Sequence, residues 1–89
     1  MFVITKDLLN VEPGDHPLTG HMFNGNNSNA CSHKFRLYDD DGLLYFEGRM
    51  HDNPLQSEGD ISFEPLDTLQ GDYGVTEMRV RKRGKWVTI

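Results

Sequence analysis

Hydrophobic and polar residues alternate over residues 34–49 in the way that is typical of a β-hairpin. Asp41-Gly42 is the predicted turn, because glycine adopts the positive φ that a two-residue type I′ turn requires without steric cost. With this turn, Phe35, Leu37 and the apolar residues of the returning strand share one face. We expect that face to pack on the core.

The same turn predicts cross-strand pairs that support one another. It pairs an aromatic with an aromatic residue, an apolar with an apolar one, a cation with an anion, and an aromatic residue with a glycine. The pairs are Tyr38 with Tyr45, Leu37 with Phe46, Arg36 with Glu47, and Phe35 with Gly48. A four-residue loop over 39–42 would shift the pairing by two residues and leave every side chain on its face.

A second hairpin is predicted at the end of the chain. Residues 75–82 alternate, Arg83-Gly84 supplies the turn, and residues 85–89 return. This register places Val80 opposite Val87 on the apolar face. Arg81 and Trp86 meet on the other face, close enough for a cation–π contact.

The rest of the chain predicts only short elements. A short strand is expected at Val3-Ile4, another at 61–63, and one helical turn at 65–69, whereas residues 13–33 form a long polar loop. We therefore predict a single β-rich domain over 1–89 that is mainly β. It is a small antiparallel sheet of two hairpins plus short strands, arranged as a compact barrel or a two-layer sandwich, with at most one short helical turn.

The size and composition of the chain predict a modest core and a partner. The chain has 89 residues, a hydrophobic content of 36% and a mean hydropathy of −0.62. A homodimer would bury further apolar surface. The single cysteine, Cys31, excludes an intrachain disulfide and, with no apolar run near the start, favours the cytoplasm and no membrane segment.

Charge is distributed unevenly along the chain. The net charge is −5, and all fourteen acidic residues lie within 1–78, whereas residues 79–89 contain five Lys or Arg residues and no acid. This basic end is typical of a solvated edge strand that resists aggregation. A local contact with an anion or a self-complementary dimer interface is the alternative.

The candidate binding surface is the face of the two hairpins that carries aromatic and arginine side chains. Its predicted members are Arg36, Tyr38, Tyr45, Arg79, Arg81 and Trp86. Such residues are enriched at protein interfaces, so a protein partner or a homodimer is expected. They also stack on nucleic acid bases, but the net charge of −5 argues against nucleic acid unless the cations form a segregated patch.

Metal binding is the alternative function in the polar loop. His16, His21, Cys31 and His33 could form a tetrahedral zinc site that fixes the loop, although their spacing fits no familiar zinc motif. Residues 39–42 resemble the start of a calcium loop, but apolar residues occupy the downstream ligand positions. No cofactor other than zinc is suggested.

Catalysis is not expected. Cys31 and His33 are two residues apart, but no nearby acid would orient the histidine, and no glycine-rich phosphate loop precedes a helix. The sequence therefore favours a non-catalytic protein-interaction module.

Five short segments carry a resemblance to known proteins. They are Arg36-Leu37, Asp39 to Gly42, Glu47-Gly48-Arg49, Phe63 to Asp67 and Gly84 to Trp86. In this order they resemble small bacterial proteins of plasmids and phages that share an Arg-Leu-x-Asp-Asp-Asp-Gly hairpin. The resemblance implies an accessory role in a mobile element but no particular activity, and it does not include the histidine-rich segment.

Overall fold

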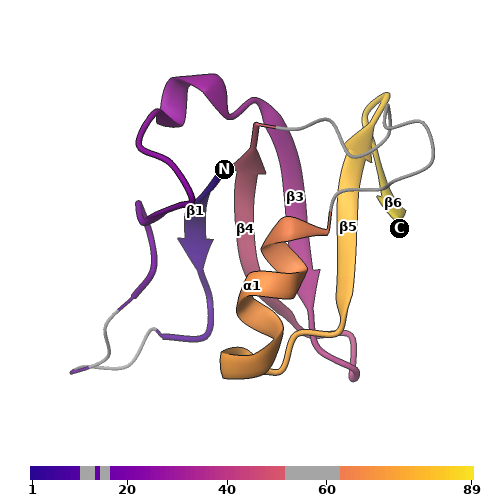
Figure 1. The fold of residues 1–89 in the computed structure, drawn as a ribbon. Helices are drawn as coiled ribbons and strands as arrows, with labels where there is room; N and C mark the ends of the chain where they lie inside the picture. The colour runs from indigo at the N-terminus through magenta and orange to yellow at the C-terminus, as the bar shows by residue number, and fades with distance from the viewer. Residues whose placement is uncertain (11–13, 15–16, 52–62) are drawn as a thin grey trace.

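The computed structural model describes residues 1–10, 14, 17–51 and 63–89, and forms one antiparallel sheet with a helix packed on it (Figure 1). The strands are β1 (Phe2–Asp7), β2 (Met22–Phe23), β3 (His33–Tyr38), β4 (Leu44–Met50), β5 (Glu77–Lys82) and β6 (Lys85–Thr88). The helices are α1 (Glu64–Tyr73) and the 3₁₀ helix η1 (Ser28–Ala30). The order β2-β1-β4-β3-β5-β6 makes β2 and β6 the edges of the sheet. The predicted mainly antiparallel β fold is confirmed.

The second layer of the fold is α1 rather than a second sheet. In Figure 1 the helix lies in front of β4 and β3, and its residues Pro65 and Leu69 are buried against the strands. The described strands leave the sheet open at β2 and β6, so it does not close into a barrel. The last strand, β6, is an edge strand, but it carries only Lys85 of the five cations in 79–89, whereas Arg79, Arg81 and Lys82 lie on the inner strand β5.

Helix α1 is longer than the single turn predicted over 65–69. Pro65 lies in the first turn, where its missing N–H costs no helical hydrogen bond, and the carboxylates of Glu64 and Asp67 complement the helix dipole there. Gly71 lies within the helix, and Gly74 ends it with a φ of 72°. Packing against the sheet therefore overrides the weak helix propensity of this segment. The strand expected at 61–63 falls mostly outside the described residues.

The second hairpin has the predicted register. Val80 pairs with Val87, and Arg81 pairs with Trp86. Both turn positions have the positive φ of a type I′ turn, 50° at Arg83 and 79° at Gly84.

The first hairpin has the predicted pairs near its open end and a different turn. Phe35 pairs with Gly48 and Leu37 with Phe46, as expected. Only Gly42 has a positive φ, 81°, so the turn is not type I′. The loop is longer than two residues, since Asp39 N–H donates to Leu43 O, but the pairing is not shifted by two as a loop over 39–42 would require. A β-bulge follows on β4, where Tyr38 pairs with Leu44 instead of Tyr45.

The bulge moves Tyr45 away from its predicted face. Tyr45 packs against the hydrophobic core, and its ring lies edge-on to that of Phe46, with centroids 6.5 Å apart. The prediction that Tyr45 belongs to the aromatic and arginine surface is therefore wrong. The extra residue of a bulge reverses the alternation on one side of it, which strict period-two reasoning cannot anticipate.

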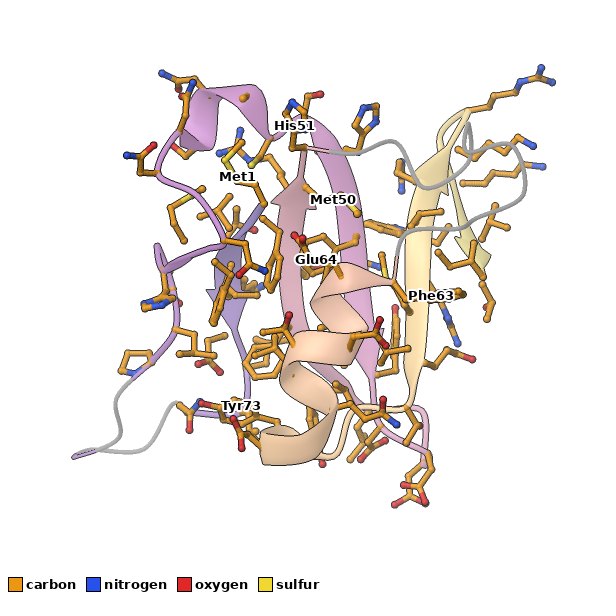
Figure 2. All side chains as sticks on the ribbon, viewed as in Figure 1. Met1, Met50, His51, Phe63, Glu64 and Tyr73 are labelled. Atoms are coloured by element: carbon orange, nitrogen blue, oxygen red, sulfur yellow. The ribbon has the colours of Figure 1, made fainter. Side chains whose placement is uncertain are left out.

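The hydrophobic core lies between α1 and the sheet. Its buried members come from four strands, from α1 and from the segment after it: Phe2, Ile4, Phe35, Leu37, Phe46, Met50, Leu69, Val75, Met78 and Val80. Figure 2 shows Phe63 and Tyr73 near the two ends of α1, and both pack against this cluster. No helix among the described residues is both long enough and apolar enough to cross a membrane.

The described part of the polar segment 13–33 is organised around β1. It contains β2 and η1, and the backbone of Ile4 accepts a hydrogen bond from Gly20 N at 2.6 Å and donates one to His21 O at 3.1 Å. This segment therefore extends the sheet rather than forming a single structureless loop.

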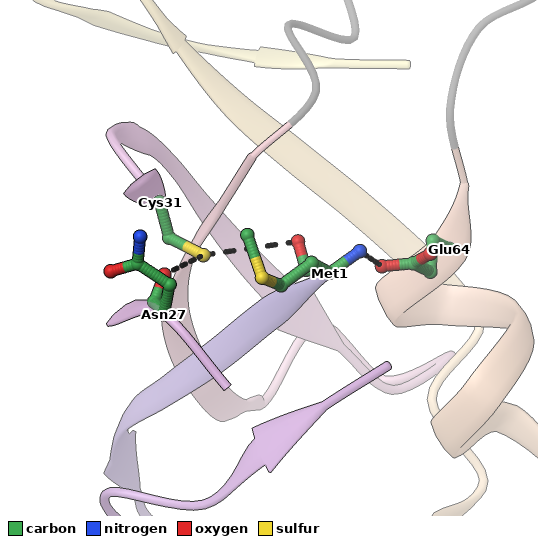
Figure 3. Close-up of polar contacts among 4 residues, drawn as sticks. All are labelled: Met1, Asn27, Cys31 and Glu64. Atoms are coloured by element: carbon green, nitrogen blue, oxygen red, sulfur yellow. Dashed lines mark hydrogen bonds and ion pairs between the residues drawn. The ribbon is translucent and has the colours of Figure 1, made fainter. Parts of the chain in front are cut away.

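Contacts of Met1 link the residue that follows β4 to α1. The carbonyl oxygen of Met1 accepts the backbone N–H of His51 at 3.0 Å, and Figure 2 shows Met1 beside Met50 and His51. The amino group of Met1 forms an ion pair with Glu64 (Figure 3).

Candidate functional site

The sheet face opposite α1 carries charged and aromatic side chains. Successive side chains of a strand point to opposite faces, and Phe35 and Leu37 are buried in the core. Lys34, Arg36 and Tyr38 therefore lie on the other face, and pairing aligns them with residues of β4, β5 and β6. We call this surface the cationic face: Lys34, Arg36, Arg49, Arg79 and Arg81, with Tyr38, Trp86, Glu47 and Glu77.

Three guanidinium groups lie over aromatic rings on the cationic face. The Cζ atom of Arg36 is 4.1 Å from the ring centroid of Trp86, and that of Arg81 is 5.3 Å from the same centroid. The Cζ atom of Arg79 is 4.1 Å from the ring centroid of Tyr38. Cation–π attraction at these distances favours the stacked positions of the three guanidinium groups.

The two carboxylates of the cationic face are each bound by an arginine. Arg36 Nε lies 2.8 Å from Glu47 Oε1, and Arg79 Nε lies 2.7 Å from Glu77 Oε2. Among the described residues, no acidic side chain forms an ion pair with Lys34, Arg49 or Arg81. The cationic face therefore has a local excess of positive charge.

The other described acids lie away from the cationic face. Three of them are on α1 (Glu64, Asp67 and Asp72), three are in the turn at 39–41, and Asp7 is buried. Among the described residues, the cations of this face are thus segregated from most of the acids, although the net charge of the chain is −5. The net charge argued against a nucleic acid partner unless the cations formed a segregated patch, and the described residues form such a patch.

A hollow of about 410 Å³ opens on the cationic face. It is lined by residues of five strands, and four of the lining side chains are cations: Lys34, Arg36, Arg49 and Arg81. Trp86 forms part of its wall, and its one acid, Glu47, is the ion-pair partner of Arg36. The volume lies within the range of small-molecule binding sites.

Five of the six residues predicted for the binding surface come together on the cationic face: Arg36, Tyr38, Arg79, Arg81 and Trp86. Tyr45 does not, for the reason given above. Sequence reasoning missed Lys34 and Arg49, although they alternate in step with Arg36 and Glu47 and that period could have included them.

The structure does not assemble the predicted zinc ligands that it describes. His16 lies outside the described residues. In the part of the chain that the structure covers, His21, Cys31 and His33 do not form a group of potential ligands. Cys31 is 1% exposed, and its Sγ lies 3.9 Å from the carbonyl oxygens of Met1 and Asn27, which are two acceptors within reach of its single S–H (Figure 3).

The acidic turn at 39–41 is explained by its own hydrogen bonds. Asp39 Oδ1 accepts the backbone N–H of Leu43 at 2.8 Å and that of Asp41 at 2.9 Å. The bond from Leu43 is the main reason that the pKa of Asp39 lies below its usual value, and the hydroxyl of Tyr45 adds to the effect. The same hydroxyl contact raises the pKa of Tyr45. The carboxylates of Asp39, Asp40 and Asp41 lie close together. The hydrogen bonds that Asp39 accepts from the backbone of the loop give it a structural role there.

Comparisons with known proteins add no family to this description, because no protein-family model, curated protein or solved structure matches the chain.

Proposed function

We propose that this protein is a non-catalytic interaction module that binds a negatively charged partner through the cationic face. The observation that carries the proposal is the local excess of positive charge on a sheet face that no described α-helix covers. Stacking of Arg36 on Trp86 and of Arg79 on Tyr38 also supports the proposal, because it favours positions of these guanidinium groups on this face. We further propose a cytoplasmic setting, supported by the single cysteine, and an accessory role in a mobile element, supported by the resemblance of the hairpin.

Retention on an immobilised polyanion such as heparin tests this function. At pH 7.5 we expect the wild-type protein to be retained, although its sequence pI is about 5.1, because the column samples the local charge of the cationic face. The variant Lys34→Gln with Arg49→Gln should elute at clearly lower salt, since it removes two cations that form no ion pair with any acid the structure describes.

The matched control removes two cations from the tip of the second hairpin. Lys82 pairs with Lys85 next to the turn, and neither lines the hollow. We expect Lys82→Gln with Lys85→Gln to elute close to the wild type. Equal losses in the two double variants would show that the column reads overall charge, and wild-type protein in the flow-through would contradict the proposal.

A further inference from the structure

If the cationic face is the contact surface, the side chains that line the hollow indicate which class of ligand it receives. We propose that the hollow receives one nucleotide of a single-stranded nucleic acid, with the base against the Arg81 and Trp86 side chains and the phosphates on Lys34 and Arg49. This inference rests on the proposed function and names the class of its partner.

The planar groups in the hollow favour a nucleotide over a carboxylate. Arg81 is exposed, and its guanidinium lies over the indole of Trp86 with Cζ 5.3 Å from the centroid. A nucleobase can extend such a stack, because bases pack on guanidinium planes as they do on aromatic rings. An aspartate or glutamate side chain of an acidic protein would occupy little of a hollow of about 410 Å³ and would leave this surface unused.

The arrangement of the cations suits the backbone of a single strand. Lys34 and Arg49 are cross-strand partners on neighbouring strands, whereas Arg81 and Trp86 are partners on the two strands beyond β3. Cationic and planar groups thus lie on opposite sides of the same hollow. A single-strand site combines these two features, a cationic track for phosphates and a surface on which bases stack.

The shape of the face favours a single strand over a duplex. The major groove of a DNA duplex admits a helix or a two-stranded ribbon, whereas the cationic face is a surface of four strands with a central hollow. A base must be unpaired to enter a hollow beside Trp86. The acids of α1 lie on the opposite side of the sheet and therefore do not face a nucleic acid bound on the cationic face.

The test compares ligands on the unmodified protein. A mixed-sequence oligonucleotide of about 12 nucleotides, as DNA and as RNA, is titrated at about 50 mM salt and followed by anisotropy and by the emission of Trp86. Trp86 is the one tryptophan of the chain, so its quenching reports on the hollow. We expect binding with quenching, and affinity at least about tenfold weaker for an abasic oligonucleotide of equal charge.

Two variants at Arg81 separate the contribution of its planar guanidinium group from that of its positive charge. Arg81→Lys keeps the charge but loses the guanidinium plane, so we expect it to prefer the normal over the abasic oligonucleotide less than the wild type does. Arg81→Gln should also lower the slope of log affinity against log salt by about 0.7. Lys82→Gln on the hairpin tip is the control with the same charge change, and we expect it to keep the preference for bases.

The alternatives give different results. Equal affinity for the normal and abasic strands, or tighter binding of a duplex, would overturn the nucleotide inference. Binding of polyglutamate in preference to either oligonucleotide would overturn it in favour of an acidic protein partner, while the proposed function would stand. Absence of binding to every polyanion, with no retention on heparin, would overturn both proposals. The oligonucleotide that binds more tightly, DNA or RNA, identifies which kind of nucleic acid supplies the nucleotide.

Discussion

Replacement of Gly48 by alanine is expected to lower the free energy of unfolding by about 3 kcal/mol. Gly48 lies in the middle of β4, where it pairs with Phe35 on one side and Ile4 on the other. A Cβ atom at this position would lie 2.5 Å from Phe35 Cζ and would also clash with the backbone carbonyl oxygen of Val3. Because both neighbours belong to a packed sheet, the strain cannot be relieved by a change of one rotamer.

Urea unfolding measures this effect, and Gly71→Ala is the matched control. Gly71 is an exposed residue of α1, and nothing lies within 4 Å of a Cβ atom built there. We expect Gly71→Ala to raise stability by roughly 0.5–1 kcal/mol, because alanine is the better helix former. Equal stability of Gly48→Ala and the wild type would contradict the close packing of Phe35 on the glycine.

A second variant identifies which contact is responsible. Shortening Phe35 to leucine removes the ring contact but leaves the carbonyl oxygen of Val3 in place. We therefore expect Gly48→Ala with Phe35→Leu to be no more stable than Gly48→Ala alone. Recovery of stability would show that the ring, rather than the backbone of β1, opposes the extra carbon.

Local sequence signals predicted the two hairpins better than any other part of the fold. Arg83-Gly84 determines both the turn and the register of β5 with β6, since both positions take a positive φ. At Asp41-Gly42 the same kind of signal is ambiguous, because glycine also serves in the longer loop. Hydrogen bonds to the Asp39 carboxylate favour that loop, and side-chain capping is not encoded in an alternation pattern.

Pairing between distant segments could not be predicted from the sequence. The neighbour of β3 on its second side is β5, which is separated from it by β4 and α1 along the chain. This pairing places Arg36 beside Arg79 and brings the guanidinium of Arg36 over the ring of Trp86, so it creates the cationic face. Period-two alternation identified which residues share a face, whereas the grouping of their charges into a basic surface depends on the non-local pairing.

The carboxylate of Asp7 organises the chain after β1, and its removal is expected to have the second large effect on stability. It accepts backbone N–H groups from Leu9 at 3.0 Å, Asn10 at 2.9 Å and Leu18 at 2.7 Å, and the side-chain amide of Asn10 at 2.8 Å. Asp7 is only 6% exposed, so Asp7→Ala would leave several donors without a partner. We expect a loss of about 2–4 kcal/mol, measured by urea unfolding. Asp72→Asn, an exposed acid on α1, should change stability by less than about 0.5 kcal/mol.

The same carboxylate predicts how stability depends on pH. Burial alone would raise the pKa of Asp7, but the hydrogen bonds from Leu18, Asn10 and Leu9 outweigh it, so the pKa lies below the usual value of 3.8. A carboxyl with a lowered folded-state pKa stabilises the fold above its unfolded pKa and loses that contribution as pH falls through the folded value. We therefore expect unfolding free energy to fall with pH below about 4, and to fall less steeply in Asp7→Asn. Asp39 shares this behaviour, so part of the acid dependence should persist in that variant. An acid slope in Asp7→Asn equal to that of the wild type would show that the carboxylate is not held as the structure describes.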